Sequence, residues 1–242
     1  MEERAMEQLK LENHQLNHVM ELFNQKKLSV EHVPAHYKLH IYSSEQETIA
    51  VVRYSIYQEF TPEGIFQARE FFNHVIVAVR AGLAGLVCYE NQELVDHKVF
   101  RAYMVRKKQG KSQIKYLKTK GKSRAGSRVR LGETKEFFKQ IAERLQDYEA
   151  RMRVDHVFLS CATTLIPYLF EDNSFLKTAK IQKQISKIPF HIQQPTFENL
   201  LKAHHQLTFN QILIKENQFV NTQDINDFLS QSDEFRPSHD DW

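Results

Sequence analysis

The sequence of 242 residues lacks the features that are typical of membrane proteins, secreted proteins and disulfide-rich proteins. It has no apolar run near the roughly 20 residues that a membrane-spanning helix needs. The N-terminal residues carry both signs of charge and lack the apolar stretch of a secretory signal. Two cysteines, Cys88 and Cys161, are too few for a disulfide framework or a cysteine-based zinc site. We therefore expect a cytoplasmic protein without membrane contact.

Acidic residues are missing from one long segment. Residues 97–131 contain no Asp or Glu, whereas the rest of the chain holds all 30 acidic residues and 20 of the 33 Lys and Arg residues. A cationic segment on an acidic body is the charge distribution expected of a protein that binds a polyanion. A solvated loop without a ligand is the simpler alternative. The basic residues of this segment are Lys98, Arg101, Arg106, Lys107, Lys108, Lys111, Lys115, Lys118, Lys120, Lys122, Arg124, Arg128 and Arg130.

The hydrophobic pattern predicts an α/β fold with a mixed β-sheet flanked by helices. Strands are expected at 37–43, 48–57, 74–79, 82–89, 95–105, 154–160 and around 181–188, and helices at 5–27, from Thr61 through Phe71, at 134–152, near 164–170 and at 196–206. Between strand 95–105 and helix 134–152 we expect a long basic loop containing Gly110, Gly121 and Gly126. The predicted domains are an N-terminal helical extension (1–34), an α/β domain (35–205) and a polar, weakly ordered C-terminal tail (206–242).

Histidines do not form a convincing metal site. His32, His36 and His40 are four residues apart, but Pro34 interrupts the stretch and His40 lies in a predicted strand. Nucleotide-binding, nucleophile-elbow and zinc-protease motifs are absent from the sequence. We expect no metal and no cofactor.

Gln113 is a neutral amide within the basic segment. Its side chain can orient a water or hydroxyl group, and its backbone N–H can donate to a developing oxyanion. It cannot act as a strong acid or base. On the residues alone, Gln113 is either an RNA contact or a catalytic residue.

Three blocks of the sequence resemble the Vms-like release factor (VLRF) domain, a relative of the central domain of the eukaryotic peptide chain release factor. They are HKVFRAYMVRKKQGKSQ (97–113), GKSRAGSRVR (121–130) and KIPFHIQQPTFENL (187–200), and the resemblance extends over about residues 70–205. The matching positions are His97, Lys98, Phe100, Tyr103, Val105, Arg106, Lys108, Gly110, Gln113, Ile188, Pro189, Pro195 and Thr196.

The resemblance implies a release-factor-like fold with an RNase H-like layer, and an enzyme that frees nascent chains from peptidyl-tRNA on stalled large ribosomal subunits. It implies that Gln113 is catalytic and that Gly110 and Ser112 shape its loop. It further implies that the basic residues of the segment hold RNA phosphates: Lys98, Arg101, Arg106, Lys107, Lys108, Lys111, Arg124, Arg128 and Arg130. A non-catalytic factor that binds ribosomes or tRNA is the alternative.

This sequence departs from the family pattern at specific positions. The segment Gly110-Lys111-Ser112-Gln113 stands where release factors have Gly-Gly-Gln, so peptidyl-tRNA hydrolysis and endonucleolytic cleavage within the CCA end both remain open. The family's arginine before the tyrosine is Ala102 here, with Arg101 one position earlier and expected on the other face of the strand. A partner protein could be recruited through the N-terminal helix or the C-terminal tail. The stalled complex that is recognised and the oligomeric state stay open.

Overall fold

The computed structural model describes residues 6–102, 122–171 and 173–234, with side chains for all of these except 122–133, 179 and 232–234. The chain forms two compact units. Unit 1 combines the residues up to Glu70 with those from His205 onward, and unit 2 comprises Phe71–His204. In the described part of the chain, no helix is both long and apolar enough to cross a membrane.

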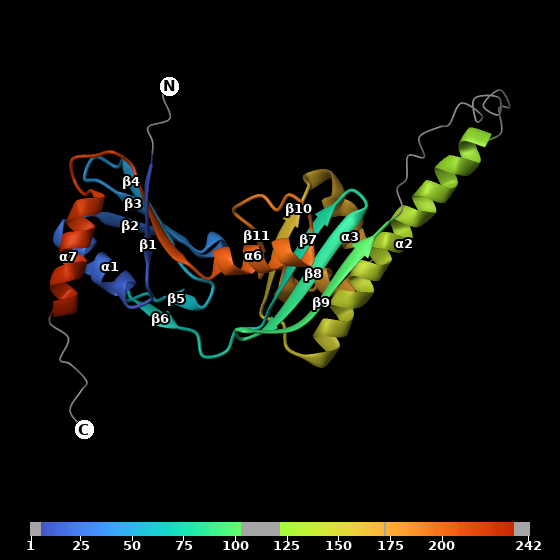
Figure 1. Ribbon diagram of the computed structural model, residues 1–242, viewed down its shortest axis with the longest axis horizontal. Coiled ribbons are helices and arrows are strands. Elements are labelled where there is room, and N and C mark those ends of the chain that lie inside the picture. Colours follow the sequence, from blue (N-terminus) through green and yellow to red (C-terminus); the bar gives the residue numbers. More distant parts are fainter. Residues whose placement is uncertain (1–5, 103–121, 172, 235–242) are drawn as a thin grey trace. The chain divides into compact units, whose positions relative to one another are not determined.

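Unit 2 is built on a five-stranded mixed sheet with the order β11-β10-β7-β8-β9 (Figure 1). Strand β10 is parallel to both β11 and β7, whereas β7, β8 and β9 are joined antiparallel. The predicted mixed α/β sheet is therefore confirmed. The strands are β7 (His74–Arg80), β8 (Leu83–Glu90), β9 (Glu93–Arg101), β10 (His156–Cys161) and β11 (Ile185–Lys187).

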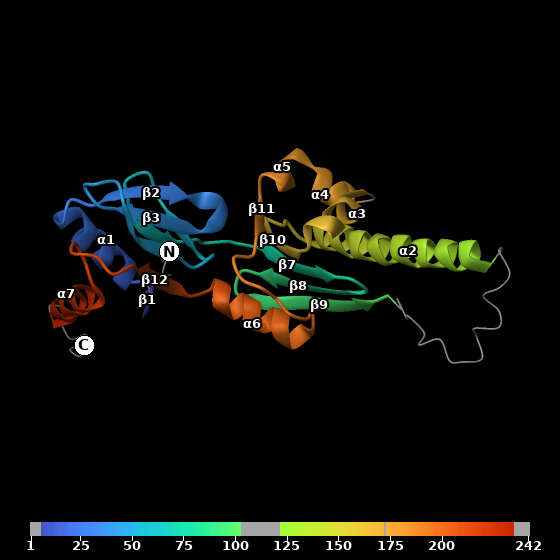
Figure 2. The same cartoon turned by 90° about the horizontal axis from the view of Figure 1, so that it is seen from above.

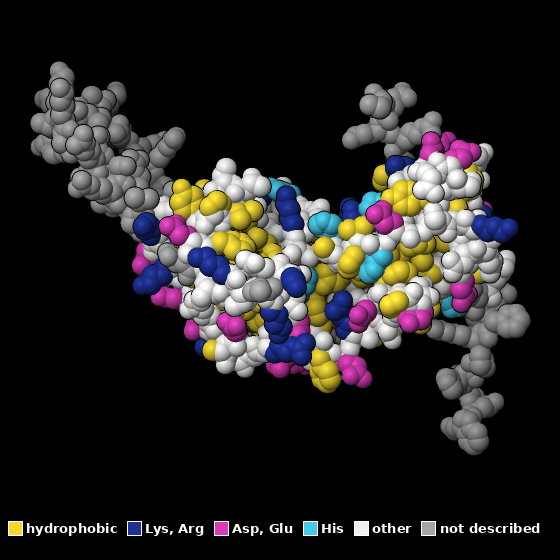
Figure 3. Space-filling view, turned by 180° about the vertical axis from the view of Figure 1, so that it is seen from behind, with side chains coloured by type: hydrophobic (Ala, Val, Ile, Leu, Met, Phe, Trp, Pro, Cys, Tyr) yellow, Lys and Arg dark blue, Asp and Glu magenta, His cyan; other side chains and the backbone are white. Residues whose placement is uncertain are grey.

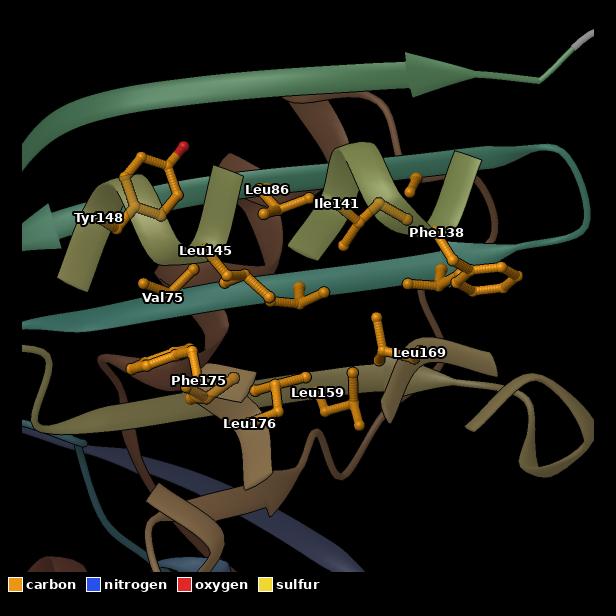
Figure 4. Close-up of a cluster of buried hydrophobic side chains, with 14 of the residues drawn as sticks. Val75, Leu86, Phe138, Ile141, Leu145, Tyr148, Leu159, Leu169, Phe175 and Leu176 are labelled. Carbon is orange, nitrogen blue, oxygen red and sulfur yellow. The ribbon is translucent and has the colours of Figure 1, made fainter. Parts of the chain in front are cut away.

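One face of this sheet is covered by α2 (Lys122–Arg151), η3 (Thr163–Leu165), α3 (Ile166–Glu171), α4 (Ser174–Lys177) and α5 (Ala179–Gln182) (Figures 1 and 2). Apolar residues of α2 recur at helical spacing and point into the core, because such spacing aligns them along one stripe. Figure 4 shows this stripe facing side chains from the sheet and from α3 and α4. The buried residues of the stripe are Phe137, Phe138, Ile141, Leu145 and Tyr148.

The opposite face carries α6 (Phe197–Leu207) (Figure 2). Residues 188–196 connect β11 to this helix and form a strap along the sheet. Thr196 accepts from the backbone N–H of Asn199 at 3.3 Å, as a helix N-cap does. A Cβ on Gly85 would lie 2.6 Å from the Pro195 carbonyl oxygen, so only glycine permits this approach. The Ile-Pro…Pro-Thr block thus has a structural role in closing this face.

We predict that Gly85→Ala lowers the free energy of unfolding by about 3 kcal/mol, because the obstructing atom belongs to the backbone and cannot rotate away. Urea denaturation measures the change. Gly64→Ala is the control: nothing lies within 4 Å of its added methyl, and its positive φ of 82° costs only about 1 kcal/mol. Equal losses in the two variants would contradict the tight contact at Pro195.

Unit 1 contains a five-stranded antiparallel sheet with the order β1-β12-β4-β3-β2, and a hairpin of β5 and β6. Helices α1 and α7 contact each other and are tied by an ion pair between Lys26 and Asp224 at 2.9 Å. The elements are β1 (Glu7–Leu11), α1 (Gln15–Gln25), β2 (Ser29–Val33), η1 (Pro34–His36), β3 (Lys38–Tyr42), β4 (Thr48–Arg53), β5 (Gln58–Phe60), β6 (Phe66–Ala68), β12 (Asn210–Ile214) and α7 (Thr222–Glu234).

Of the two helices predicted in this unit, the one at 5–27 is confirmed only in its second half, which is α1, and the other is wrong. The first half of the helix expected at 5–27 is strand β1, which pairs with β12 near the other end of the sequence. The helix expected from Thr61 through Phe71 is the turn and second strand of the β5–β6 hairpin. The backbone N–H of Gly64 donates to the carbonyl of Thr61, and the positive φ of Gly64 closes the turn. Proline and glycine two residues apart favoured this turn over a helix.

The predicted extensions at both ends also differ from the structure. Residues 35–70 group with the terminal segments, because β3 and β4 pair with β2 and β12. Residues 222–234 of the tail expected to be weakly ordered form α7, which buries Ile225 and Leu229. Asn221 accepts from the N–H of Asp224 at 2.8 Å, and Asp224 accepts in return at 3.3 Å, a capping box that stabilises the start of this helix.

Candidate nucleic-acid interface

The basic segment is attached to unit 2 at two points. Strand β9 ends at Arg101 within the segment, and helix α2 begins at Lys122, also within it. The loop predicted to continue through Arg130 is therefore helical from Lys122, including Gly126. Residues 103–121, called the arm below, lie outside the described residues. Seven of the predicted site residues belong to the arm: Arg106, Lys107, Lys108, Gly110, Lys111, Ser112 and Gln113, which is the expected catalytic residue.

The attachment of the arm is apolar. The N–H of Ala102 donates to the carbonyl of Gly82 at 3.0 Å, which fixes the last described residue before the arm to the β7–β8 turn. Beside it lies a pocket of about 50 Å³. Figure 3 shows hydrophobic side chains gathered over α3 at this end of unit 2, where Tyr168 is 45% exposed. The pocket is lined by Arg80, Ala81, Gly82, Ala102, Thr134, Phe137, Phe138 and Leu165.

An ion pair fixes α2 to β9 further along. Arg144 donates from Nη2 to the Oδ2 atom of Asp96, and its guanidinium lies 5.2 Å from the ring centre of Tyr148. Both charged side chains are about one quarter exposed. Asp96 thus sits on the face of β9 that packs against α2. Sequence reasoning missed this pair, because its partners are far apart in the sequence and follow no motif.

We predict that Asp96→Asn lowers the free energy of unfolding by about 1–2 kcal/mol, since the half-buried Arg144 then loses its closer charged partner and keeps only the more exposed Asp147 at 3.8 Å. Guanidinium denaturation measures it. Glu143→Gln provides the comparison, because its pair with Lys139 is more than half exposed. An exposed pair at this helical spacing should contribute only about 0.3 kcal/mol. A loss at Asp96 no larger than at Glu143 would show that the pair does not anchor α2.

Lys98 and Arg101, the two predicted RNA contacts on β9, are both exposed and lie on opposite faces of the sheet. Lys98 is paired with Leu86, whose side chain faces α2, whereas Arg101 is paired with Leu83 on the other face. Directly paired residues share a face in an antiparallel sheet. Ala102 lines the pocket on the α2 side, so the expectation that Arg101 lies on the opposite face agrees with the register.

The predicted phosphate contacts Arg124, Arg128 and Arg130 fall within the first three turns of α2. Backbone positions 124 and 128 are one turn apart and share a helix face. The first turn contains no acidic residue. Cationic residues at a helix N-terminus oppose the positive end of the helix dipole. The start of α2 therefore adds to the positive charge of the arm.

His97, one of the positions that match the family pattern, has a packing role. Its ring stacks on Phe197 of α6, with centroids 4.0 Å apart. On the same face Arg80 donates to the carbonyl of Ile192 at 2.7 Å and contacts the ring of His191 at 2.8 Å. Arg80 and His191, which sequence analysis did not single out, hold the strap close to the attachment of the arm.

Both cysteines are buried or half-buried free thiols. Burial raises the pKa of Cys88 to about 12 and that of Cys161 to about 11, so both thiols stay protonated at neutral pH. Within the described residues, no group of three or more His, Cys, Asp or Glu side chains could hold a metal ion. His32 contacts the hydroxyl of Tyr54 at 2.7 Å, and the register places it on the sheet face opposite to His40.

The family model described as Bacteroidetes VLRF1 release factor matches residues 72–215, which is more than half of the chain. This chain belongs to the VLRF1 release factor family. The match includes nearly all of unit 2, the arm and strand β12. The resemblance inferred from the three sequence blocks is thereby confirmed.

Two further comparisons match this family member to proteins named Vms1. The protein named tRNA endonuclease VMS1 from Saccharomyces cerevisiae is 32% identical over 123 residues, which are 50% of this chain and 19% of that protein. This chain therefore spans only about a fifth of its curated relative. A solved structure described as Vms1 mitochondrial localization core covers 83% of this chain and 98% of its own, with 14% identity and a TM-score of 0.44.

A histidine lies at the centre of an aromatic stack in unit 2. His74 is fully buried, and its ring is parallel to that of Tyr89, with centroids 5.1 Å apart. His204 stacks on Tyr89 at 3.7 Å, and Phe72 lies 5.3 Å from His74. Burial, with the nearby His204 and His156, holds the pKa of His74 well below its ordinary value of 6.5.

We predict that this VLRF1 protein loses stability in mild acid. A depressed folded-state pKa means that the unfolded chain binds the proton more tightly. The contribution of His74 is therefore complete above pH 6.5 and is lost as the pH falls below it, with a slope of up to about 1.4 kcal/mol per pH unit. Urea denaturation from pH 7.5 to 5 measures the slope. His74→Phe should flatten it, while His36→Gln, at an exposed position, should not; an unchanged slope in His74→Phe would refute the assignment.

Proposed function

We propose that this chain is a ribosome-associated enzyme that frees nascent chains from peptidyl-tRNA on stalled large ribosomal subunits. It cleaves at or near the 3′ CCA end of the tRNA and acts in the cytoplasm. The observation that carries the proposal is the acid-free cationic segment, which runs from the end of β9 through the arm into the start of α2 in a member of a release factor family. The name of the yeast relative, a tRNA endonuclease, also supports it.

The charge of the segment suits the acceptor end of a tRNA. Thirteen cations without a single carboxylate create a strong positive potential that attracts phosphates, and no acidic side chain within the segment competes with the phosphates for the cations. In the proposal Lys98, Arg101, Arg124, Arg128 and Arg130 hold phosphates around the arm. Within the arm, Arg106, Lys107, Lys108 and Lys111 bind close to the CCA end, and Gly110 and Ser112 shape the loop.

Gln113 is the proposed catalytic residue, and it can serve either of two reactions. In ester hydrolysis a water oxygen attacks the carbonyl carbon of the peptidyl ester, the tRNA ribose oxygen leaves, and the water proton passes to that oxygen. In nucleolysis a 2′-hydroxyl oxygen attacks the adjacent phosphorus to form a 2′,3′-cyclic phosphate, the bond to the 5′-oxygen of the next nucleotide breaks, and the hydroxyl proton passes to that oxygen. An uncharged amide can orient the attacking oxygen in both.

We predict that Gln113→Ala lowers the rate of chain release at least a hundredfold while ribosome binding stays within twofold of the parent, since a lost positioning group affects the reaction more than affinity. Release is measured on purified large subunits carrying peptidyl-tRNA. Gln109→Ala, another neutral amide in the same segment, is the matched control and should retain activity. If Gln113→Ala releases chains as fast as Gln109→Ala, the alternative of a non-catalytic ribosome- or tRNA-binding factor replaces this proposal.

The tRNA product of the same reaction identifies the broken bond. Mass analysis of its 3′ end distinguishes an intact CCA, which hydrolysis leaves, from a shortened end, which nucleolysis leaves. The departure from Gly-Gly-Gln, where Lys111 and Ser112 separate Gly110 from Gln113, favours nucleolysis, and so does the name of the yeast relative.

Binding to the ribosome should weaken steeply with salt, because each phosphate contact releases counterions. We expect the affinity to fall by at least a hundredfold between 50 and 200 mM salt if six or more phosphates are held. Replacing Lys107 and Lys108 by Gln should make the slope shallower by about 1.5. A salt-independent affinity would contradict a phosphate-dominated interface.

A further inference from the structure

The sheet of unit 1 has two chemically different faces. Residues facing α1 and α7 are apolar and buried, among them Leu39, Val52 and Ile212, which the register places side by side. Glu7 on this face contacts Thr222 at the start of α7. Along each strand, the residues that alternate with the buried ones point to the opposite face and are half-buried or exposed. Below, this opposite side is called the open face.

Three cations form a single row across the open face. Lys38 is paired with Arg53, Arg53 with Gln211, and Gln211 with Lys10. Paired residues in an antiparallel sheet share a face and lie about 5 Å apart, so the row spans roughly 14 Å over four strands. Below, these four residues are called the cationic row. It is formed by strands from both ends of the sequence, so no local sequence motif predicts it.

The cationic row is unfavourable for the fold alone. Like charges directly opposite each other on neighbouring strands destabilise a sheet, and Lys38 and Arg53 form such a pair. Among the described residues no carboxylate lies within ion-pair distance of Lys10, Lys38 or Arg53. A position where a sequence breaks a local rule without a gain in stability is a candidate functional site. A bound polyanion would supply the missing negative charge.

Aromatic rings lie next to the cationic row. His40 and Tyr42 are the next open-face residues of β3, and their rings stack at 6.3 Å. At the other end, the Lys10 ammonium lies 4.9 Å from the ring centre of Phe209, which also contacts His205. A sheet that combines cations with partly exposed rings is a surface on which nucleic-acid bases stack while phosphates pair with the cations.

Acidic residues are scarce on the open face. Glu31 is the one carboxylate that the five described strands place there, and it lies on the edge strand β2. It accepts from the Tyr42 hydroxyl at 2.6 Å, so it leaves the cationic row unpaired. The combination of rings with a row of cations favours RNA over an acidic protein, which would need no stacking surface. A membrane surface would favour an amphipathic helix over a pleated sheet.

We propose that the open face of unit 1 is a second RNA-binding surface, which takes single-stranded or loop RNA along the cationic row with bases against Tyr42, His40 and Phe209. This surface is distinct from the arm, and it requires no catalysis by Gln113. On a ribosomal complex it would contact RNA at a second point.

The test uses the full chain, a fluorescein-labelled 15-nucleotide single-stranded RNA and fluorescence anisotropy. We expect the double variant Lys38→Gln/Arg53→Gln to bind at least fivefold more weakly at 100 mM salt, with a salt slope shallower by about 1.4. The control Lys180→Gln/Lys202→Gln removes the same charge from exposed positions of unit 2 and should bind within twofold of the parent. Tyr42→Ala should weaken binding by about fivefold or more through lost stacking.

A second variant separates binding from folding. Lys38→Glu places opposite charges on β3 and β4, so it should raise the thermal midpoint while it weakens RNA binding further. Unchanged RNA affinity in the double variant, or a lower thermal midpoint in Lys38→Glu, would overturn the proposal. Loss of binding to anionic phosphatidylserine vesicles with no change for RNA would also overturn it. Chain release by Gln113→Ala tests the proposed function separately, so either proposal can fail alone.

Discussion

The packing of α2 against the sheet of unit 2 is the interaction on which the candidate interface depends. The arm leaves the sheet after Ala102, which follows β9, and it continues into α2, whose buried stripe begins at Phe137 and packs on the sheet. Hydrophobic burial supplies the stability, and the Asp96–Arg144 pair gives the contact a fixed register. A cationic segment held at two ends on a rigid scaffold can be presented to a ligand at a lower entropic cost than a free tail.

Several features of the chain oppose the stability of the fold. Cations begin α2 at the unfavourable end of its dipole, Lys38 faces Arg53 across two strands, and His74 is buried where it must stay neutral. The first two features lie at positively charged surfaces, where a bound polyanion would reduce the repulsion between the cations. His74 differs, because its ring is enclosed by aromatic neighbours that stabilise the neutral form.

Local patterns in the sequence predicted unit 2 well, and in unit 1 they predicted strands β3 and β4 but not β1 or the β5–β6 hairpin. The strands at 74–79 and 82–89 and the stripe of α2 follow from periodicity, which depends only on neighbouring residues. The apolar spacing at 5–27 favoured one helix, whereas a partner strand from the other end of the chain makes its first half β1. For the site, charge and family motifs identified the basic segment, but Asp96, Arg144 and the cationic row depend on register, which the sequence alone does not reveal.

The order of the strands in unit 1 has a consequence for the synthesis of the chain. Strand β12 lies between β1 and β4, yet it follows all of unit 2 in the sequence. The N-terminal strands therefore cannot pair with β12 until the whole of unit 2 has emerged from the ribosome, and unit 2 can fold before them. A nascent chain of this protein thus exposes an incomplete sheet during most of its own translation, and truncated products lacking β12 would be prone to aggregation through the unpaired strand edges.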